Sequence, residues 1–339
     1  MSPFLKYAFR KTRWYLLTLV VGVFLNFYLP RLVPGDPISA LVSQMAGGGG
    51  FSSQSAQEMY RTFMQEFGLD QPVWRQFIDY VSLLLRGSMG TSFSQYPRPV
   101  LDILRNALPW SIALQLPAML TGWILGNALG AIAAYRKGVF DRVLFPISLF
   151  FNAIPHYALG IVVLYVFAVI LGWFPVGGGY RTGLYPALNV SFVISVIRHY
   201  ILPFSTIVLV TIGGQAIGMR EMSIYELNED YVNYARSLGI KEKFIIRYVF
   251  KNAILPQITG LALTLGLVVG GSLVTEIVFN YPGIGTYLFS AIRQSDYPLI
   301  QGCTLLIVLG VLMANFIMDL TYGLIDPRVK TAQTEEVEG

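Results

Sequence analysis

The sequence predicts an all-α membrane protein with six transmembrane helices, and two observations carry that prediction. Of the 339 residues, 54% are hydrophobic and only 13% are charged, and the mean hydropathy is +0.57. Soluble domains carry roughly 25% charged residues. The apolar residues also fall in long runs without a charge, as helices surrounded by lipid require. The single Cys303 lies in one of these runs and cannot form an internal disulfide.

Six charge-free runs meet or approach the roughly 20 residues that a helix needs to cross the hydrocarbon core. They are Trp14–Pro30, Asn106–Tyr135, Val143–Tyr180, Ile201–Met219, Asn252–Thr275 and Tyr297–Met318. The third run is long enough to include an outer loop after Trp173. A further run, Thr182–Ile197, contains Pro186 and Asn189. A seventh span there would place the loops and chain ends on conflicting sides, so we expect a surface or re-entrant segment.

The first run is expected to be a retained transmembrane helix rather than a cleaved signal peptide. A basic segment precedes it, with Lys6, Arg10, Lys11 and Arg13. The uncharged run that follows exceeds the apolar region of about 7–15 residues that is typical of signal peptides, and no small-x-small cleavage site follows it.

The distribution of basic residues predicts the orientation, because cytoplasmic loops carry an excess of Lys and Arg. With both termini in the cytoplasm, the inner segments hold 15 of the 24 basic residues and all seven lysines. The outer side holds nine arginines, six of them within or bordering one long loop. The net charge of +5 is therefore explained by membrane orientation. No basic stripe with interleaved aromatic residues indicates a nucleic-acid partner.

The runs divide the chain into a cytoplasmic N-terminus (1–13), a first span (14–30), an extracytoplasmic loop domain (31–105), a core of five spans (106–323) and a cytoplasmic tail (324–339). Within the loop domain, Gly47–Gly50 is expected to be a linker. Ser55–Phe67 and Pro72–Leu85 have helical apolar spacing, which predicts a small folded outer cap.

Small residues recur every four positions in two spans, at Gly122, Gly126 and Gly130 and again at Ala262, Gly266 and Gly270. This spacing lets helix backbones approach closely in lipid. Two interpretations stay open: packing within the chain, or helices that line a pathway at a subunit interface.

The most charged segment, Glu229–Pro256, lies between two long apolar runs on the cytoplasmic side, within a loop that spans residues 220–254. Ser223–Glu226 matches a capping box, and Asn228 offers another helix start. Glu229 and Asp230 suit a helix N-terminus, and Arg236 suits its far end.

A short helix is therefore predicted from Asp230, with Tyr231, Ala235 and Leu238 on one face. Gly239 is expected to end it in a left-handed conformation. A second amphipathic helix follows, with Phe244, Ile245, Tyr248 and Val249 apolar, until Pro256 enters the membrane. The pattern predicts a helix–glycine–helix knob that projects into the cytoplasm, where a partner protein can bind it.

These residues resemble the loop signature of permease subunits of ATP-binding-cassette importers. Asn233, Tyr234 and Ala235 occupy the Glu-Ala-Ala position, Gly239 the glycine position, and Ile254-Leu255-Pro256 the end of the motif. The first two residues depart from the general pattern, and the proline arrives four residues late. Both departures are similar to the peptide-permease branch, whose pattern is matched by Asp230, Tyr231, Ala235, Arg236, Gly239, Asn252, Ala253, Leu255 and Pro256.

The resemblance extends along most of the chain, in order and at the family spacing. The matching segments are Pro34-Gly-Asp-Pro37, Phe67-Gly-Leu-Asp70, Leu171-Gly-Trp-Phe-Pro175, Tyr281-Pro-Gly-Ile-Gly285, Asp296-Tyr-Pro298 and Asp326-Pro-Arg328. Gly87-Ser-Met-Gly90 departs from the usual Gly-Asp-Leu-Gly, so one acidic position is missing.

The resemblance implies a subunit of the bacterial or archaeal inner membrane that pairs with a second, similar permease, two cytoplasmic ATPases and an external solute-binding protein. It implies that Asp230–Gly239 is a coupling helix seated in a groove of one ATPase. ATP and Mg²⁺ would bind to the ATPase subunits, and this chain has no GxxxxGK[ST] phosphate loop and needs no cofactor of its own. The implied solutes are di- or oligopeptides, with oligosaccharides as the alternative.

A proton-coupled carrier or a channel is the competing hypothesis from a different class. Paired intramembrane acids and an inverted repeat would favour it, and neither is present in the sequence. Glu276 and Asp319 lie close to predicted span ends, where an acid can pair with a cation instead of relaying protons.

The sequence gives little support to an enzyme. His156 and His199 are far apart, and no HExxH motif, Cys cluster or GxSxG elbow is present. His156, Glu276 and the turn Tyr281-Pro282-Gly283 remain candidates for a solute pathway or an outer gate, with packing or an ordinary turn as the alternatives.

Overall fold

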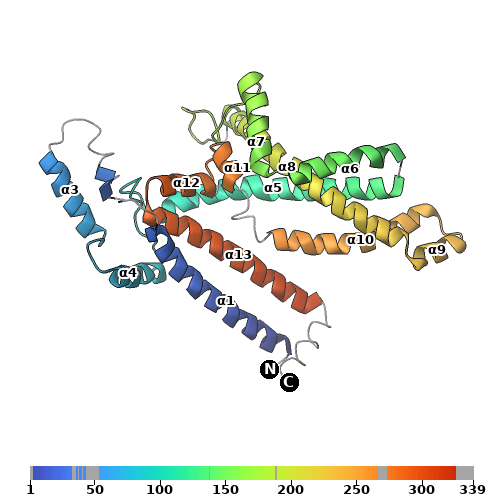
Figure 1. Cartoon of the computed structure of the whole chain (residues 1–339), viewed down its shortest axis with the longest axis horizontal. Coiled ribbons are helices and arrows are strands. Elements are labelled where there is room, and N and C mark those ends of the chain that lie inside the picture. The colour runs from blue at the N-terminus through green and yellow to red at the C-terminus, as the bar shows by residue number, and fades with distance from the viewer. Residues whose placement is uncertain are drawn as a thin grey trace. The chain divides into compact units, whose positions relative to one another are not determined.

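The computed structural model describes residues 3–32, 36, 38–39, 41–42, 53–136, 138–187, 189–265 and 273–325. Within this part of the chain the regular elements are helical, and strand pairing is limited to an isolated bridge between Thr91 and Pro99. The chain forms two compact units, Met1–Pro109 with Gly283–Gly339, and Trp110–Pro282. Figure 1 shows the helices of both.

In the first unit, α1 (Pro3–Tyr28), continued by the 3-10 turn η1 (Leu29–Leu32), lies beside α13 (Tyr297–Ile325) (Figure 1). Trp14, Leu16 and Val20 of α1 are exposed, as expected for a helix that faces lipid. A buried polar contact joins the two helices: the Asn26 Nδ2 donates to the Gln301 carbonyl oxygen at 2.8 Å. The expected first and last spans are thus confirmed as helices long and apolar enough to cross a membrane.

The segment predicted to form an outer cap is folded, as the apolar spacing predicts. The helices α3 (Ser53–Glu66) and α4 (Val73–Leu85) occupy the two predicted ranges. Phe63 of α3 is buried with Ile38, Leu41 and Val42, and the Phe77 ring of α4 packs edge-on against Phe27 of α1. The cap therefore has a small core of its own and a hydrophobic attachment to the first span.

The first unit is completed by α12 (Ile284–Arg293) and the first turns of α5 (Val100–Arg136). Their buried residues form one cluster: Val100, Ile103, Leu104, Ala107, Ile284, Ala291, Leu299, Ile300 and Cys303. The Asp296 carboxylate is fully buried beside it and accepts hydrogen bonds from the Ser94 backbone N–H at 2.9 Å and from the Ser94 hydroxyl at 2.7 Å. Asp296 thereby fixes the loop before α5 to the start of α13.

In the second unit, α5 packs closely against α8 (Val190–Leu227) through its glycine repeat. A Cβ on Gly126 would lie 2.6 Å from the Gln215 Cβ and 2.9 Å from the Ile212 carbonyl oxygen. Gly122 and Gly130 meet α8 in the same way. The packing interpretation of this repeat is therefore confirmed. Gly266 and Gly270 of the other repeat lie outside the described residues, as do the Gly47–Gly50 run and the tail from residue 326.

The predicted third span is broken. It consists of α6 (Gly138–Ala153), then α7 (His156–Leu164) and the π-helical turn η2 (Tyr165–Ile170), with a bend of 99° between the two halves. Pro155 accounts for the break, because proline lacks an N–H and disfavours helical backbone in the residue before it. The expectation of one span followed by a loop after Trp173 missed this bend.

The expectation of a separate segment at Thr182–Ile197 holds for its first residues only, because α8 begins within this range. Asn189 is not a breaker within a surface segment but the N-cap of α8, and its Oδ1 accepts from the Phe192 N–H at 2.8 Å. Residues 190–197 therefore form the first turns of a helix of 38 residues that includes the predicted fourth span. At 1.5 Å per residue this helix is about 57 Å long, which exceeds the roughly 30 Å of the hydrocarbon core.

The described residues contain four helices long and apolar enough to cross a membrane, or five if the bent pair counts as one span. The predicted fifth span begins within α10 (Glu242–Leu265), and α11 (Leu273–Val278) is the next helix described after residues 266–272, which lie outside the described residues. The structure thus agrees with an all-helical membrane protein.

Candidate functional site

The predicted cytoplasmic knob is present as α9 (Asp230–Ser237), a short helix between α8 and α10. Gly239 ends it with a φ of +73°, as predicted. The Gly239 N–H donates to the Arg236 carbonyl at 2.9 Å, and the Ile240 N–H donates to the Ala235 carbonyl at 3.2 Å. This pair of bonds is a Schellman motif, which satisfies carbonyls that the end of a helix leaves open.

An apolar anchor holds α9 against its neighbours. Val232 is fully buried against Ile245 and Val249 of α10, with Leu227 and Ala235 at the edge of the cluster. Sequence reasoning missed Val232, although its i, i+3 relation to Ala235 placed both on one face. Burial of these side chains fixes the hairpin, since burying one aliphatic side chain stabilises a protein by roughly 1.5–3 kcal/mol.

A polar network joins the same three helices. The Tyr231 hydroxyl donates to Glu226 Oε2 of α8 at 2.7 Å, and Asn252 Nδ2 of α10 donates to the same oxygen at 3.3 Å. Partial burial and the bond to Glu226 raise the pKa of Tyr231 to about 12. The predicted capping box at Ser223–Glu226 was wrong, because both residues lie inside α8. Glu226 instead accepts bonds from α9 and α10.

The turn after α9 is closed by an ion pair. The Arg236 Nη2 lies 2.9 Å from Glu242 Oε1 at the start of α10. The hydrogen bond between them lowers the pKa of Glu242. The acidic residues at the start of α9 do not cap it through a side chain, since Glu229 occupies the N-cap without such a bond and Asp230 lies in the first turn. Asn228 ends α8 and does not begin α9.

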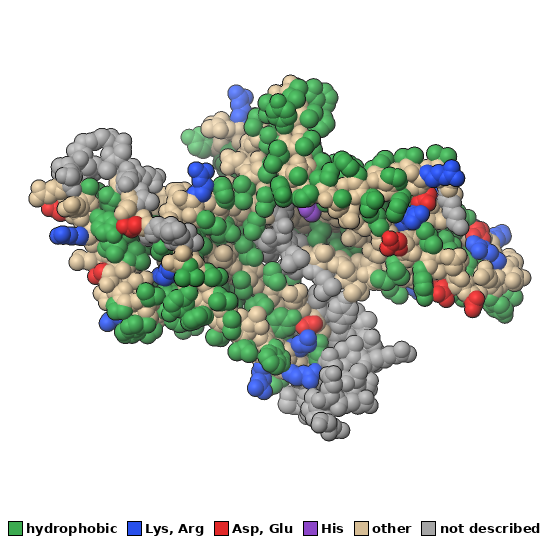
Figure 2. Space-filling view, viewed as in Figure 1, with side chains coloured by type: hydrophobic (Ala, Val, Ile, Leu, Met, Phe, Trp, Pro, Cys, Tyr) green, Lys and Arg blue, Asp and Glu red, His purple; other side chains and the backbone are tan. Residues whose placement is uncertain are grey.

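Two large side chains are exposed on the outward side of α9. Tyr234 is 67% exposed and Leu238 is 61% exposed, and Ile240 in the turn and Phe244 and Tyr248 of α10 are exposed as well. Asn233 and Arg236 are exposed beside it, and Figure 2 shows acidic and basic side chains gathered at this end of the second unit. Tyr231, Ala235 and Leu238 do not share one face as predicted, because Leu238 points outward while Ala235 packs inward.

The end of the loop motif is helical throughout. Asn252, Ala253, Leu255 and Pro256 all lie within α10, so the helix that begins beside α9 continues past Pro256 without a break. Ala253 is fully buried, whereas Leu255 is exposed. Trp123 of α5 donates through Nε1 to the Gln257 carbonyl at 3.1 Å, one residue beyond the proline. One continuous helix therefore leads from the turn after α9 past the proline.

The candidate pathway residues fall into two different environments. His156 lies at the broken third span and lines a pocket of about 510 Å³ with Gln115, Asn152 and Gln215. Glu276 is fully buried in α11, and its Oε1 lies 3.4 Å from Gln115 Nε2. The structure thus brings His156 and Gln115 to one pocket and places Glu276 against the same glutamine.

The residues of the predicted gate turn are packed. Tyr281 is buried against Leu114, Ala118, Ile207 and Val208, and its ring meets Trp110 edge-on. Pro282 packs against Gly179, where an added Cβ would lie 2.7 Å from the Pro282 Cγ. Gly283 is the N-cap of α12. This turn is therefore a packing element in the structure.

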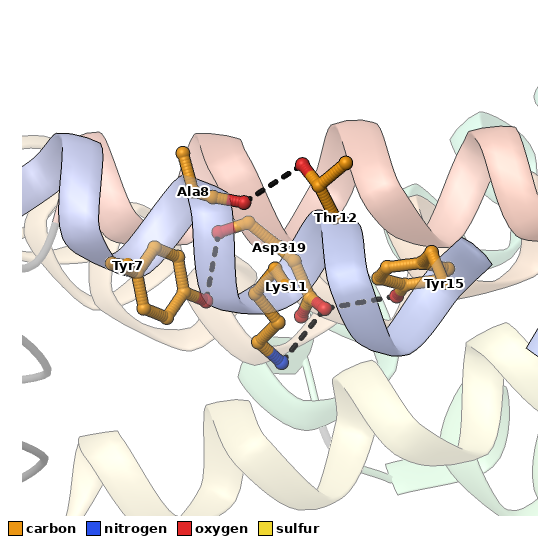
Figure 3. Close-up of polar contacts among 6 residues, drawn as sticks. All are labelled: Tyr7, Ala8, Lys11, Thr12, Tyr15 and Asp319. Atoms are coloured by element: carbon orange, nitrogen blue, oxygen red, sulfur yellow. Dashed lines mark hydrogen bonds and ion pairs between the residues drawn. The ribbon is translucent and has the colours of Figure 1, made fainter. Parts of the chain in front are cut away.

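Asp319 pairs with a cation, as its position near a span end suggested. Lys11 Nζ of α1 lies 2.8 Å from the Asp319 Oδ2, and the Tyr15 hydroxyl donates to the same oxygen at 2.9 Å. The Tyr7 hydroxyl donates to the Asp319 backbone carbonyl at 3.2 Å (Figure 3). These contacts join α1 to α13. Among the described residues, no group of three or more His, Cys, Asp and Glu side chains is arranged to hold a metal ion.

The comparisons with known proteins agree with this architecture. Residues 126–331 match the family described as binding-protein-dependent transport system inner membrane component. A di/tripeptide transport system permease protein of Pseudomonas aeruginosa is 31% identical over 90% of this chain and 93% of its own length. A putative peptide permease protein of Brucella ovis is 33% identical over 96% and 99% of the two chains. A glutathione transport system permease protein of Escherichia coli is 30% identical over 96% and 99%.

The family match covers more than half of the chain, and its range includes α9 and the whole hairpin. The relatives align over nearly their full lengths, so the likeness is not confined to one motif. The chain belongs to the family of binding-protein-dependent transport system inner membrane components.

Proposed function

We propose that the chain is one of two permease subunits of an ATP-driven importer and that α9 is its contact with an ATPase. The observation that carries this proposal is the construction of the hairpin. Its inner side is fixed by Val232 and by the bond from Tyr231 to Glu226, while Tyr234 and Leu238 present an apolar surface to the outside. Exposed apolar surface beside charged groups is characteristic of a protein interface.

The hairpin transmits motion because it is fastened on both sides. Glu226 belongs to α8 and Asn252 to α10, and both helices continue into the predicted membrane core. Movement of a partner that binds α9 would therefore rotate these helices together as one rigid element. In this proposal, six spans with cytoplasmic termini form half of the pathway, and a second permease forms the other half.

The remaining partners are two ATPase subunits, which bind ATP and Mg²⁺, and an extracytoplasmic solute-binding protein. This chain takes no chemical step and binds no cofactor. The solutes we propose are di- or oligopeptides, supported by relatives named for dipeptides, tripeptides and glutathione. Uptake of oligosaccharides by the same mechanism is the alternative. The pairing of Asp319 with Lys11 gives a proton-coupled carrier less support.

The test replaces an exposed residue of α9 so that packing is unaffected. We expect Leu238→Asp to abolish co-purification of the ATPase subunits with the permease pair and to abolish ATP-dependent peptide uptake in proteoliposomes. Leu85→Asp is the matched control, because Leu85 is 84% exposed on α4, in the predicted outer domain. It should leave ATPase co-purification unchanged. Uptake that continues in vesicles without any ATPase subunit would show that the importer proposal is wrong.

A further inference from the structure

The second unit contains a pocket that none of the roles above explains. Its volume is about 720 Å³, within the range of roughly 300–1,000 Å³ that is common for small-molecule sites. The loop after η2 and the first turns of α8 line it, and its distinctive residues are Trp173, Phe174, Arg181, Ser195, Arg198 and His199. In the predicted orientation this end of α8 faces the extracytoplasmic side.

The charge of the pocket is positive and is not balanced by its surroundings. Arg181 and Arg198 are both exposed at its lining, and neither forms an ion pair with a carboxylate of the described residues. The sequence contains no Asp or Glu between Asp141 and Glu221. A cleft with charges of one sign raises the local concentration of oppositely charged ligands.

The pocket is held in shape before any ligand binds. The Arg181 N–H donates to the Ser195 hydroxyl at 2.8 Å, which ties the loop to α8. The Gly178 N–H donates to the Phe279 carbonyl at 3.0 Å, which ties the other end of the loop to the segment after α11. A preformed site binds more tightly, because the ligand does not have to order the loop.

The lining offers more than charge. The His199 Nδ1 lies 2.7 Å from the Ser195 carbonyl oxygen, which can only accept, so Nδ1 carries the proton of that bond. In the neutral ring, Nε2 is then an acceptor that suits an amide or amine N–H. Trp173 and Phe174 add aromatic surface. Guanidinium groups that bind a carboxylate, an acceptor for N–H and aromatic walls together match the chemistry of a small peptide.

We propose that this pocket is an extracytoplasmic subsite that receives the carboxylate of a small peptide through Arg181 and Arg198. The proposal rests on the proposed function and narrows it, because a neutral oligosaccharide carries no group that needs these two arginines. The volume also favours a whole small solute over one acidic side chain of a docking protein, which would fill only part of it.

Direct binding is the first test and needs no binding protein. Saturation-transfer NMR would titrate alanylalanine and its C-terminal amide against the assembled complex of permeases and ATPases. We expect the wild type to bind the free acid and the amide to bind about tenfold more weakly, at the lower end of the effect of a hydrogen bond to a charged group, because the site is open to water. The double variant Arg181→Gln with Arg198→Gln should bind the free acid as weakly as the wild type binds the amide. Its affinity for the amide should equal that of the wild type.

Two control variants separate charge from bulk. Arg181→Lys with Arg198→Lys keeps the charges and should recover part of the affinity. Arg86→Gln removes an exposed arginine of the predicted outer domain and should bind like the wild type. Because Arg181 and Arg198 are exposed, their replacement removes no buried packing, and each single variant provides the same comparison if the double variant assembles poorly.

Equal binding of the acid and the amide by the wild type would overturn the subsite. The subsite would also be overturned if the double glutamine variant binds both peptides like the wild type but its ATPase activity is no longer stimulated by the solute-binding protein. In that case the two arginines would serve to dock the solute-binding protein. The importer proposal fails by a different result, which is uptake that continues in vesicles without any ATPase subunit.

Discussion

Replacement of Gly239 tests the link between the shape of α9 and transport. The residue has a φ of +73°, and its N–H and that of Ile240 close the helix on the Arg236 and Ala235 carbonyls. A Cβ added at this position meets no atom within 4 Å. The whole cost of Gly239→Ala is therefore conformational, and a left-handed backbone costs an L-residue about 1–2 kcal/mol. For the β-branched Gly239→Val we expect at least the upper value.

A loss of 1–2 kcal/mol corresponds to about a five- to thirtyfold rise in the population of the opened hairpin. Hydrogen exchange of the α9 amides reports that population directly. We expect their exchange to accelerate by this factor in Gly239→Ala and by more in Gly239→Val. In the assembled complex, ATPase stimulation by the binding protein and uptake should be lost in Gly239→Val, while membrane insertion persists.

Two variants provide the controls. Gly239→Asn should lie close to the wild type, because asparagine tolerates the left-handed region. Gly260→Ala changes a glycine of α10 that also has open space around the added Cβ but no positive φ, and it should be neutral or slightly stabilising. The reasoning is refuted if Gly239→Val leaves α9 exchange and coupled uptake at wild-type values.

Three further predictions concern the polar contacts. The hydrogen bond of Tyr231 stabilises the hairpin fully below the unfolded pKa of about 10, and this stabilisation is lost as the pH rises through the folded pKa of about 12. The difference in thermal stability between the wild type and Tyr231→Phe should therefore shrink between these two pH values. A difference that stays constant would contradict this reasoning. Arg236→Glu should loosen the turn by at most about 1 kcal/mol because the pair is exposed, and the swapped pair Arg236→Glu with Glu242→Arg should recover it by hydrogen exchange. Asp319→Asn should lower the free energy of unfolding of the α1–α13 pair by about 1–3 kcal/mol, because Lys11 keeps a partly buried charge without its partner. Adding Lys11→Met should offset part of that loss. An unchanged melting temperature for Asp319→Asn alone would argue against the pairing.

Predictions from the sequence were correct where a residue type favours a single local structure. Gly239 ends α9 because glycine adopts a positive φ at little cost, and Gly122, Gly126 and Gly130 pack α5 against α8 because nothing larger fits there. The helices of the outer cap followed from apolar spacing. Each of these predictions depends on a property that the residue has in any protein.

Predictions failed where one residue has two local uses. Asn189 suits a turn as well as a helix N-cap, and only the helix that follows it decides between them. Ser223 and Glu226 have the spacing of a capping box, which also occurs inside a long helix. In each case the neighbouring turns decided the outcome.

The sequence by itself determined the membrane class, the family, the position of the charged hairpin and the end of its short helix, because hydrophobic length, charge bias and glycine placement act locally. Only the tertiary structure decided which side of α9 is buried, since Val232 packs against Ile245 and Val249 from a different helix. It also decided that Asp319 pairs with Lys11, and that Arg181, Arg198 and His199 line one pocket. These contacts join residues far apart in the chain, and the spacing of residues along a chain carries no information about distances across a fold.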